Sequence, residues 1–326
     1  MRIGVTGGAG YIASHVIQDL LEAGHEVTVI DNMSTGNTEN ILVGQKGYRF
    51  LGGDLGTTAG LDAFFATGPE IIFHFAASKA AGDSMEIPEQ YAANNIRGTL
   101  GLLERMAVSD CRRIIFSSTA AVYGSPQYLP VDENHALEPE NYYGVTKKII
   151  EENLYWFSKL KGIRYAALRY FNAAGYDIRG RVRGLEINPR NLLPIVMEVA
   201  AGQRAELDVY GDDYDTPDGT CIRDYIHVSD LASAHIRAME TIIKEDRDLV
   251  VNLGSTNGLS VQEMINAARE VTGHKIPSRN VGRRAGDPGK LIASSEKALR
   301  EMNWKAEHSD AHTLVETMWR VYKDKF

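Results

Sequence analysis

The stretch that decides the fold is RIGVTGGAGYIASH, residues 2–15. A short run rich in β-branched residues leads into a cluster of glycines, and an amphipathic segment over residues 11–23 follows. Glycines at such a turn let backbone N–H groups approach a pyrophosphate, which the positive end of the helix dipole then stabilises. The spacing is Gly7-x-x-Gly10-x-x-Ala13, and alanine is tolerated at the third position of this dinucleotide fingerprint.

The next acidic residue after this turn supports the same interpretation. Asp31 ends the following strand-like run, at the distance of roughly 20 residues that the fingerprint requires. A carboxylate there accepts hydrogen bonds from ribose hydroxyls and repels a 2′-phosphate, which favours NAD over NADP. The alternative is that Asp31 only caps the end of its strand.

Strand-like and helix-like segments alternate over the first half of the chain. This alternation predicts an α/β fold, a Rossmann-type doubly wound parallel sheet with helices on both faces. The expected strands are 2–6, 26–31, 48–54, 70–76, 112–118, 164–171 and 250–255, and the expected helices are 11–23, 87–108 and 141–161.

The pattern loosens after residue 174 into loops rich in glycine, proline and charge, and becomes regular again with a helix-like segment over 228–244. We therefore expect a second, smaller α/β domain that is interleaved with the first. The expected Rossmann domain is 1–174 with 225–254 returning to it, and the expected substrate domain is 175–224 with 255–326.

Composition narrows the class of protein. A formal charge of −8 over 326 residues argues against a general nucleic-acid binder or an anionic-membrane binder. The two cysteines, Cys111 and Cys221, have no metal-type spacing, and no run approaches the ~18 apolar residues of a membrane span. His308 and His312 lack further ligands, so we expect no metal site. The low cysteine count is typical of a reducing compartment, so we expect a cytoplasmic location.

The segment NYYGVTKK, residues 141–148, raises a question of chemistry. On a helix, residues four apart share a face, so Tyr143 lies beside Lys147. A free phenol has a pKa near 10, and an adjacent ammonium together with a cationic nicotinamide would lower it toward that of a base. We expect Lys147 to have this effect, and also to hold the nicotinamide ribose, although the pair could be an ordinary surface contact.

Longer motifs are more specific than the glycines: TGGAGYIASH, HFAASKAAGDS, SSTAAVYG, RYFNAAG, NLLP, GDDYDTPDGTCIRDYIHV and GRRAGD. Together they resemble the UDP-glucose 4-epimerases of the extended short-chain dehydrogenase/reductase family, across nearly the whole chain. The resemblance implies an isomerase that converts UDP-galactose to UDP-glucose and back, with tightly bound NAD and a transient 4-keto sugar. It also implies a homodimer whose interface is formed by the helices over 87–108 and 141–161.

The resemblance assigns roles to individual residues. Tyr143 would remove the proton of the sugar 4-OH, Lys147 would support it, and Thr119 would hydrogen-bond the sugar oxygen. Those expected at the cofactor are Gly7, Gly10, Tyr11, Ile12, Asp31, Asn32, Asp54, Leu55, Phe75, Ala76, Ala77, Lys79, Asn94, Ser117, Tyr143, Lys147 and Tyr170. Those expected at the substrate are Lys79, Thr119, Tyr143, Asn172, Asn191, Leu192, Tyr210, Arg223, Arg284, Asp287 and Leu291.

Several alternatives stay open at this point. Related dehydratases carry an Asp-Glu pair after the active-site hydroxyl, and here the next residues are Ala120 and Ala121. Leu291 stands where the family carries a bulky tyrosine in enzymes confined to glucose and galactose, so UDP-N-acetylhexosamine and UDP-glucuronate 4-epimerases remain alternatives. A non-catalytic dinucleotide sensor would be expected to lose Tyr143 and Lys147, and both are present.

Overall fold

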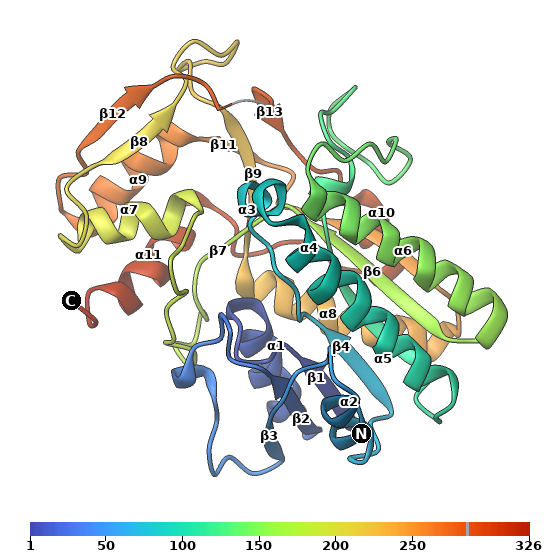
Figure 1. The fold of residues 1–326 in the computed structure, drawn as a ribbon. Coiled ribbons are helices and arrows are strands. Elements are labelled where there is room, and N and C mark those ends of the chain that lie inside the picture. The colour runs from blue at the N-terminus through green and yellow to red at the C-terminus, as the bar shows by residue number, and fades with distance from the viewer. Residues whose placement is uncertain (285–286) are drawn as a thin grey trace.

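The computed structural model describes residues 1–284 and 287–326, which form a parallel seven-stranded sheet with a smaller lobe beside it (Figure 1). The strand order is β10-β6-β5-β4-β1-β2-β3, as expected of a doubly wound α/β fold. The strands are β1 Arg2–Thr6, β2 Glu26–Asp31, β3 Tyr48–Gly52, β4 Ile71–His74, β5 Arg113–Thr119, β6 Arg164–Tyr170 and β10 Leu249–Leu253.

Helices cover both faces of this sheet because its central strands carry buried apolar side chains on both sides. Along β4, Ile71 and Phe73 belong to one buried cluster and Ile72 to the other, so alternate side chains feed opposite faces. The first cluster includes residues of α1 Tyr11–Glu22, α8 Val228–Glu245 and α10 Glu296–Met302; the second includes residues of α2 Thr58–Phe65, α5 Gly98–Ala107 and α6 Tyr142–Lys161.

Helix α6, which carries the tyrosine and lysine of interest, has clear end signals. The Asn141 side chain accepts a hydrogen bond from the backbone N–H of Gly144 at 2.9 Å, and Gly162 ends the helix in the left-handed region with φ 67°. The observed start at Tyr142 differs by one residue from the expected 141. The N-terminus of α6 is therefore fixed, which orients the side chains of its first turns.

The expected helix over 87–108 contains an irregularity. It consists of α4 Pro88–Tyr91, a π-helical turn η2 Ala92–Arg97, and α5. A shorter helix, α3 Ala81–Glu86, precedes it and was not expected from the sequence. π-turns of this kind often occur at functional sites.

The smaller lobe has its own buried cluster, packed between helices and two small sheets. Strand β9 lies at the centre of one sheet, where it pairs with β7, β11 and β13. The elements are β7 Asn172–Ala174, α7 Leu192–Ala200, β8 Leu207–Tyr210, β9 Ile222–His227, β11 Gly258–Ser260, α9 Val261–Thr272, β12 Ser278–Val281, β13 Lys290–Leu291 and α11 Ala311–Tyr322.

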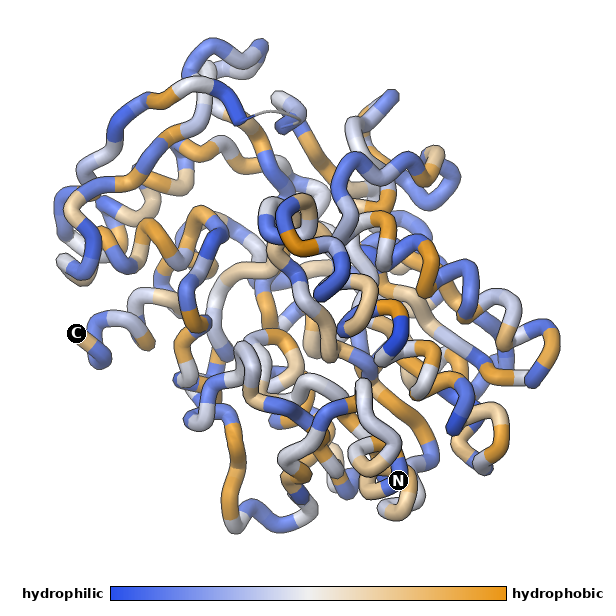
Figure 2. The backbone as a smooth tube through the Cα atoms, in the orientation of Figure 1, coloured by the Kyte–Doolittle hydropathy of each residue, from blue (hydrophilic) through white to orange (hydrophobic). Residues whose placement is uncertain are grey.

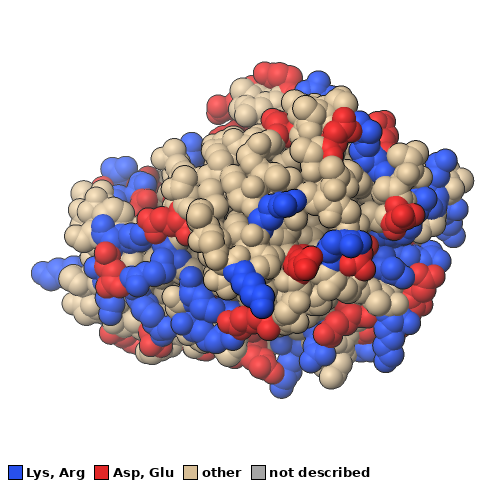
Figure 3. Space-filling view, turned by 90° about the horizontal axis from the view of Figure 1, so that it is seen from below, with Lys and Arg blue, Asp and Glu red and all other residues tan. Residues whose placement is uncertain are grey.

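The surface is polar and mixed in charge. Figure 2 shows hydrophobic segments in the strands at the centre of the molecule and hydrophilic segments in peripheral loops. Figure 3 shows Lys and Arg interspersed with Asp and Glu over one face. Within residues 1–284 and 287–326, no helix is both long and apolar enough to cross a membrane, and both cysteines are buried and free.

Candidate active site

The glycine turn between β1 and α1 forms a close cradle. Gly7 has φ +70°, and a Cβ atom there would lie 2.7 Å from the backbone nitrogen of Ala76, so only glycine fits. Gly10 precedes α1 and provides no side-chain cap, which leaves the amides of the first turn, at Tyr11 and Ile12, for an anion. Both observations fit a pyrophosphate at this turn.

Asp31 lies at the end of β2 beside this cradle. Its Oδ2 atom accepts a hydrogen bond from the Ala9 N–H at 3.0 Å, and Oδ1 accepts one from the Met33 N–H at 2.8 Å. Asp31 thus shapes the glycine turn, as in the strand-cap alternative. A carboxylate has about four lone-pair sites, so capacity remains for ribose hydroxyls.

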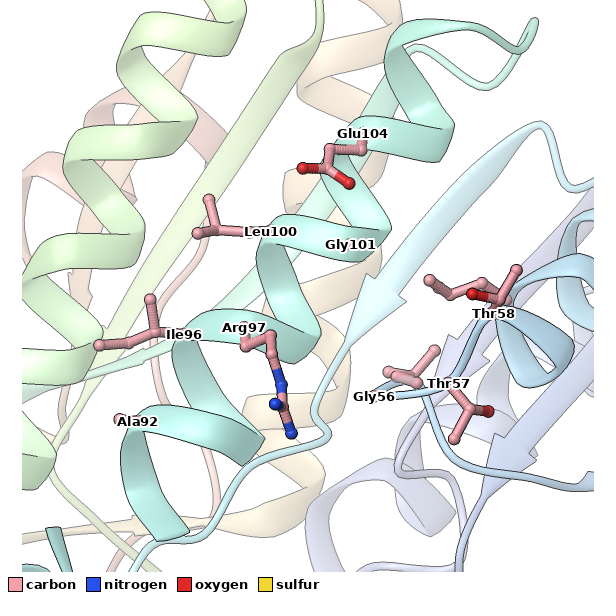
Figure 4. Close-up of a pocket in the computed structure, with 11 residues that line it drawn as sticks. Gly56, Thr57, Thr58, Ala92, Ile96, Arg97, Leu100, Gly101 and Glu104 are labelled. Carbon is pink, nitrogen blue, oxygen red and sulfur yellow. The ribbon is translucent and has the colours of Figure 1, made fainter. Parts of the chain in front are cut away.

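The expected adenine side lies along the loop after β3. Asn32 donates from Nδ2 to Asp54 Oδ2 at 3.1 Å, and Asp54 Oδ1 accepts from the Gly56 N–H at 2.6 Å. Leu55 lies in the wall of a cavity of about 340 Å³ between this loop and η2–α5 (Figure 4). The same cavity is bordered by Arg97, whose side chain extends toward the loop in Figure 4.

The chain after β4 crosses directly over the glycine turn. Ala76 donates its N–H to Thr6 Oγ1 at 3.3 Å, and Ala77 follows it. The Phe75 ring packs on the core histidine His235, with ring centroids 4.9 Å apart. Phe75 is thus partly a core residue, whereas Ala76 borders the cradle.

A buried chain of hydrogen bonds supports this crossing. His74 Nδ1 lies 2.7 Å from Thr6 Oγ1, and Nε2 lies 2.7 Å from Thr99 Oγ1. Burial lowers the pKa of His74 to about 3. His74 is therefore neutral at physiological pH and links β1, β4 and α5.

Tyr143 lies in the first turn of α6, facing the carboxyl end of β5. Its backbone N–H donates to Ser84 Oγ of α3 at 3.0 Å. Burial raises the pKa of the Tyr143 phenol to about 12, and the hydroxyl of Thr119, at the end of β5, opposes this by hydrogen bonding. The structure thus brings together the expected base and the expected hydroxyl.

The effect of Lys147 on the pKa of Tyr143 stays a prediction. Lys147 Nζ lies 5.9 Å from the centre of the Tyr143 ring and donates to the Ser117 carbonyl at 2.7 Å. Lys147 is buried, and burial lowers its own pKa to about 7, against the opposing effect of Glu151. Burial, which the sequence did not reveal, is the largest influence on the pKa of each group.

Other expected cofactor residues surround this pair. The hydroxyls of Ser117 and Tyr170 are hydrogen-bonded to each other, and Asn94 in the π-turn donates to Ser78 Oγ at 3.1 Å. Lys79 is ion-paired with Glu186 across the cleft at 2.6 Å. An incoming ligand would therefore compete with Glu186 for the Lys79 ammonium.

The expected substrate residues of the smaller lobe gather around β9. Arg223 donates to Asp287 Oδ1 at 3.0 Å, and the Arg284 guanidinium lies over the Tyr210 ring, 4.0 Å from its centre. Leu291 pairs with Arg223 in the sheet. The motif that contains Arg284 also includes 285–286, which lie outside the described residues.

Leu291 connects this lobe to the catalytic edge. It packs against a small buried cluster that includes Ala120 and Val122, directly after Thr119. Asn172 donates to the Asp224 carbonyl at 3.0 Å at the start of β7. Asn191 and Leu192 stand apart from these residues in the chain, at the start of α7, where Asn191 makes no side-chain cap.

Two features of the site were missed by the sequence analysis. Ser84 holds the backbone of Tyr143, and Glu151 forms a buried ion pair with Arg169 at 2.5 Å. A signal for Glu151 was present, since it lies four residues after Lys147 and eight after Tyr143 on one helix face. Within the described part of the chain, no group of three or more His, Cys, Asp or Glu side chains could hold a metal ion.

Comparison with known proteins agrees with this geometry. Residues 3–254 match the NAD dependent epimerase/dehydratase family. This chain belongs to that family. It is 45% identical to the UDP-glucose 4-epimerase of Halalkalibacterium halodurans over 326 residues, covering 99% of this chain and 96% of that protein.

Two solved structures of family members are also similar to this chain. The UDP-glucose 4-epimerase from Brucella ovis, in complex with NAD, has a TM-score of 0.94 and 41% identity, covering 99% of this chain and 98% of that one. The UDP-Glc/GlcNAc 4-epimerase from Campylobacter jejuni has a TM-score of 0.87 and 38% identity, covering 99% and 98%. The epimerase resemblance noted in the sequence therefore holds over the full length.

Proposed function

We propose that this chain is an NAD-dependent 4-epimerase of a UDP-hexose, interconverting UDP-galactose and UDP-glucose. The observation that carries the proposal is the meeting of Tyr143 and Thr119 at the end of β5, beside the glycine cradle. The arginine-bearing strand β9 meets the same edge through Leu291. Full-length relatives named as UDP-glucose 4-epimerases support the substrate assignment.

NAD fits the residues that are present. The cradle at Gly7 and Gly10, the uncapped start of α1 and the carboxylate of Asp31 match a pyrophosphate and an adenosine ribose. When bound, NAD would supply the hydride acceptor for oxidation of the sugar at C4 and the hydride donor for its reduction on the opposite face. Lys79, Asn94 and Lys147 lie on the elements that face its nicotinamide half.

The proton of the sugar 4-OH passes to Tyr143 as C4 is oxidised, and comes back when C4 is reduced. The Thr119 hydroxyl hydrogen-bonds Tyr143 here, which favours the phenolate, and with substrate bound it would hydrogen-bond the sugar oxygen instead. The positive charge of the nicotinamide opposes the effect of burial on the pKa of Tyr143. Ala120 and Ala121 offer no acid for the loss of water, which separates this site from dehydration.

The smaller lobe recognises the UDP group. Arg223 and Arg284 provide guanidinium donors for phosphate oxygens, and Tyr210 provides an aromatic surface. Asp287, which is paired with Arg223 here, contacts the uridine ribose. Asn172, Asn191 and Leu192 complete the contacts to the sugar and base.

A second substrate class is favoured by one observation. Leu291 is smaller than tyrosine and is packed between β9 and the residues after Thr119, so it leaves more room beside the sugar than a tyrosine would. The relative from Campylobacter jejuni is named for both UDP-Glc and GlcNAc. UDP-N-acetylglucosamine is therefore the second candidate substrate.

We propose residues 1–174 with 225–254 as the NAD-binding domain, which the place of β10 in the large sheet supports; β7 and β9, at the edges of these ranges, pair with each other in the smaller sheet. Residues 175–224 and 255–326 bind the UDP-sugar. The exposed side chains of Tyr155, Trp156 and Leu160 on α6 support a homodimer that packs α5 and α6 against their copies. Sedimentation of the wild-type chain and of Trp156→Glu would test this interface.

The test of the function uses the purified protein with UDP-galactose and no added cofactor. We expect UDP-glucose to accumulate without net NADH, and denaturation to release NAD carried through purification. Stoichiometric release of free NADH would indicate a dehydrogenase instead. A protein that binds NAD but leaves UDP-galactose unchanged would indicate the sensor alternative.

A further inference from the structure

Three ionisable side chains follow one another at four-residue spacing on the buried face of α6. Tyr143 lies at the cleft, Lys147 is 2% exposed, and Glu151 is 7% exposed. The proposed proton transfer uses Tyr143, and Lys147 is assigned to the nicotinamide half of the cofactor site. Glu151 is buried one turn further from the cleft and has no part in that transfer.

Glu151 fastens α6 to the two strands beneath it. Its Oε1 accepts a hydrogen bond from Ser118 Oγ at 2.5 Å, and its two carboxylate oxygens accept from Arg169 at 2.5–3.2 Å. Ser118 stands between Ser117, whose carbonyl accepts from Lys147, and Thr119. The Glu151 carboxylate therefore fixes the short piece of β5 that carries Ser117, the hydrogen-bond partner of Lys147, and Thr119, the partner of Tyr143.

The hydrogen bonds of Glu151 and Arg169 continue to Tyr123 and Asn252, and each of these buried side chains has a partner. Arg169 Nη1 donates to the Tyr123 hydroxyl at 2.9 Å, and that hydroxyl donates to Asn252 Oδ1 at 2.6 Å. A buried ion pair is in general weak evidence for stability, because apolar replacements are often neutral or stabilising. Positioning of the catalytic groups therefore explains the buried Glu151–Arg169 pair better than stability does.

Among the groups around Lys147, Glu151 carries the negative charge that affects the pKa of the Lys147 ammonium. On its own helix Lys147 faces the Tyr143 phenol and Glu151; on β5 it faces the Phe116 ring and the Ser117 carbonyl. The nearby ionisable groups on β4 and β6 are neutral His74, neutral Tyr170 and cationic Arg169. Among the described residues, Glu151 is the carboxylate that opposes the effect of burial on Lys147.

We propose that Glu151 is a positioning residue that holds the Ser117–Thr119 piece of β5 opposite Tyr143 and places a negative charge beside Lys147. This inference rests on the proposed function and adds a residue to its machinery. Without the carboxylate, Lys147 would lose its proton at lower pH, and the phenolate of Tyr143 would lose a neighbouring cation. The alkaline limb of the activity profile would move to lower pH.

The variants are chosen so that folding does not obscure the answer. Glu151→Gln leaves Arg169 and Lys147 as buried cations without a counter-charge, which is strongly destabilising. The double variant Glu151→Gln/Arg169→Met removes both charges of the ion pair, and Glu151→Asp keeps the negative charge. Glu152→Gln is the matched control, because Glu152 is the next residue on α6 and is exposed.

We expect the double variant to move the alkaline limb of kcat down by about one pH unit, which lowers kcat by up to about tenfold at pH values above the wild-type midpoint and leaves the acid side of the profile unchanged. Bound NAD and the KM for UDP-galactose should not change. Glu151→Asp should restore most of the wild-type profile, and Glu152→Gln should match it. A folded double variant with the wild-type profile would overturn the proposal.

A second readout does not depend on turnover. Protein labelled with 13C at the lysine Cε is titrated by NMR, and the Lys147 signal is assigned by its loss in Lys147→Met. We expect the titration midpoint of Lys147 to fall in the double variant and to stay in Glu152→Gln. Equal midpoints would overturn the proposal even if the wild type epimerises. A wild type that does not epimerise would defeat the proposed function and leave this titration to decide the role of Glu151.

Discussion

The two sides of the active-site cleft are built differently. On the α6 side, Lys147, Glu151 and Arg169 are buried and bonded into the strands. On the side of the smaller lobe, Arg223 and Asp287 are paired with each other at 11% and 32% side-chain exposure. The first side is organised by internal bonds, whereas under the proposed function the second would exchange its internal pairs for contacts to UDP.

This contrast teaches that chemistry and recognition are separated in this chain. A group that transfers a proton gains from a fixed position, because misplacement raises the barrier. A group that binds a phosphate gains from access, because it has to reach the ligand and release it. Changes on the first side should therefore alter kcat, and changes on the second side should alter KM.

The largest effect should come from Tyr143→Phe, which removes the proton acceptor and leaves the ring in place. We expect kcat to fall roughly 10²–10⁴-fold, with bound NAD retained. The measurement is UDP-galactose conversion together with the absorbance of released cofactor. Tyr142→Phe, one residue earlier, is the control, and full activity in Tyr143→Phe would remove Tyr143 from its role.

Arg223→Met should have the next largest effect, on the recognition side. Loss of a charge-assisted hydrogen bond of about 1.5–3 kcal/mol corresponds to a KM increase of roughly 10–150-fold, with kcat close to wild type. Arg283→Met is the control, since Arg283 pairs with the exposed Asp213. Steady-state kinetics of the two variants measure kcat and KM separately. A fall in kcat alone for Arg223→Met would contradict the view that the smaller lobe serves recognition and the α6 side serves chemistry.

Leu291→Tyr probes the point where the two sides meet. Added bulk beside the sugar should lower kcat/KM for UDP-N-acetylglucosamine about tenfold and change UDP-glucose much less. Parallel assays of the two sugars measure this ratio, and Leu291→Met, of similar volume, is the control. An equal loss for both sugars would mean that Leu291 does not line the sugar subsite.

The last prediction concerns the pH dependence of folding stability, which the buried His74 side chain affects without any ligand. His74 has a folded pKa of about 3 against 6.5 when unfolded, so the unfolded state binds more protons between these values. The contribution of His74 to the free energy of unfolding is fully present above pH 6.5. It is lost as pH falls toward 3, with a slope of about 1.4 kcal/mol per pH unit. His74→Gln should show a shallower loss of stability in acid than wild type.

Chemical denaturation at pH values from 7 to 4 measures this slope. His312→Gln is the control, because His312 is on the surface of α11 with a side chain that is 68% exposed. A slope in His74→Gln as steep as that of wild type would show that His74 titrates normally and is not closed off from water.

The sequence predicted the large sheet well, because its strands and helices are set by local apolar periodicity. Helix α6 was placed within one residue, and the family was identified correctly. Elements formed by tertiary contact were not predicted. Strand β13, of two residues, exists because Lys290 and Leu291 pair with β9, and nothing local marks them as a strand.

The candidate site was predicted in its residues and not in its electrostatics. The positions of Tyr143, Lys147 and Thr119 came from spacing and from resemblance, but the effect of burial on the pKa of Tyr143 was not foreseen. Spacing shows that a phenol and an ammonium are neighbours, and it does not show that both are buried. Glu151 was missed for the same reason, since the exposed Glu152 beside it has the same side chain.

The π-turn over Ala92–Arg97 has a consequence for how this chain can change in length. Asn95 within it is buried and bonded to Ser78 and Thr146. A π-turn closes its hydrogen bonds one residue later than an α-helix, so it takes up one extra residue without rotating the helix that follows. Deleting one residue here would leave a regular α-helical turn, with Leu102 and Leu103 of α5 still in the core. The deletion would therefore cost the bonds of Asn95 and not the packing of α5.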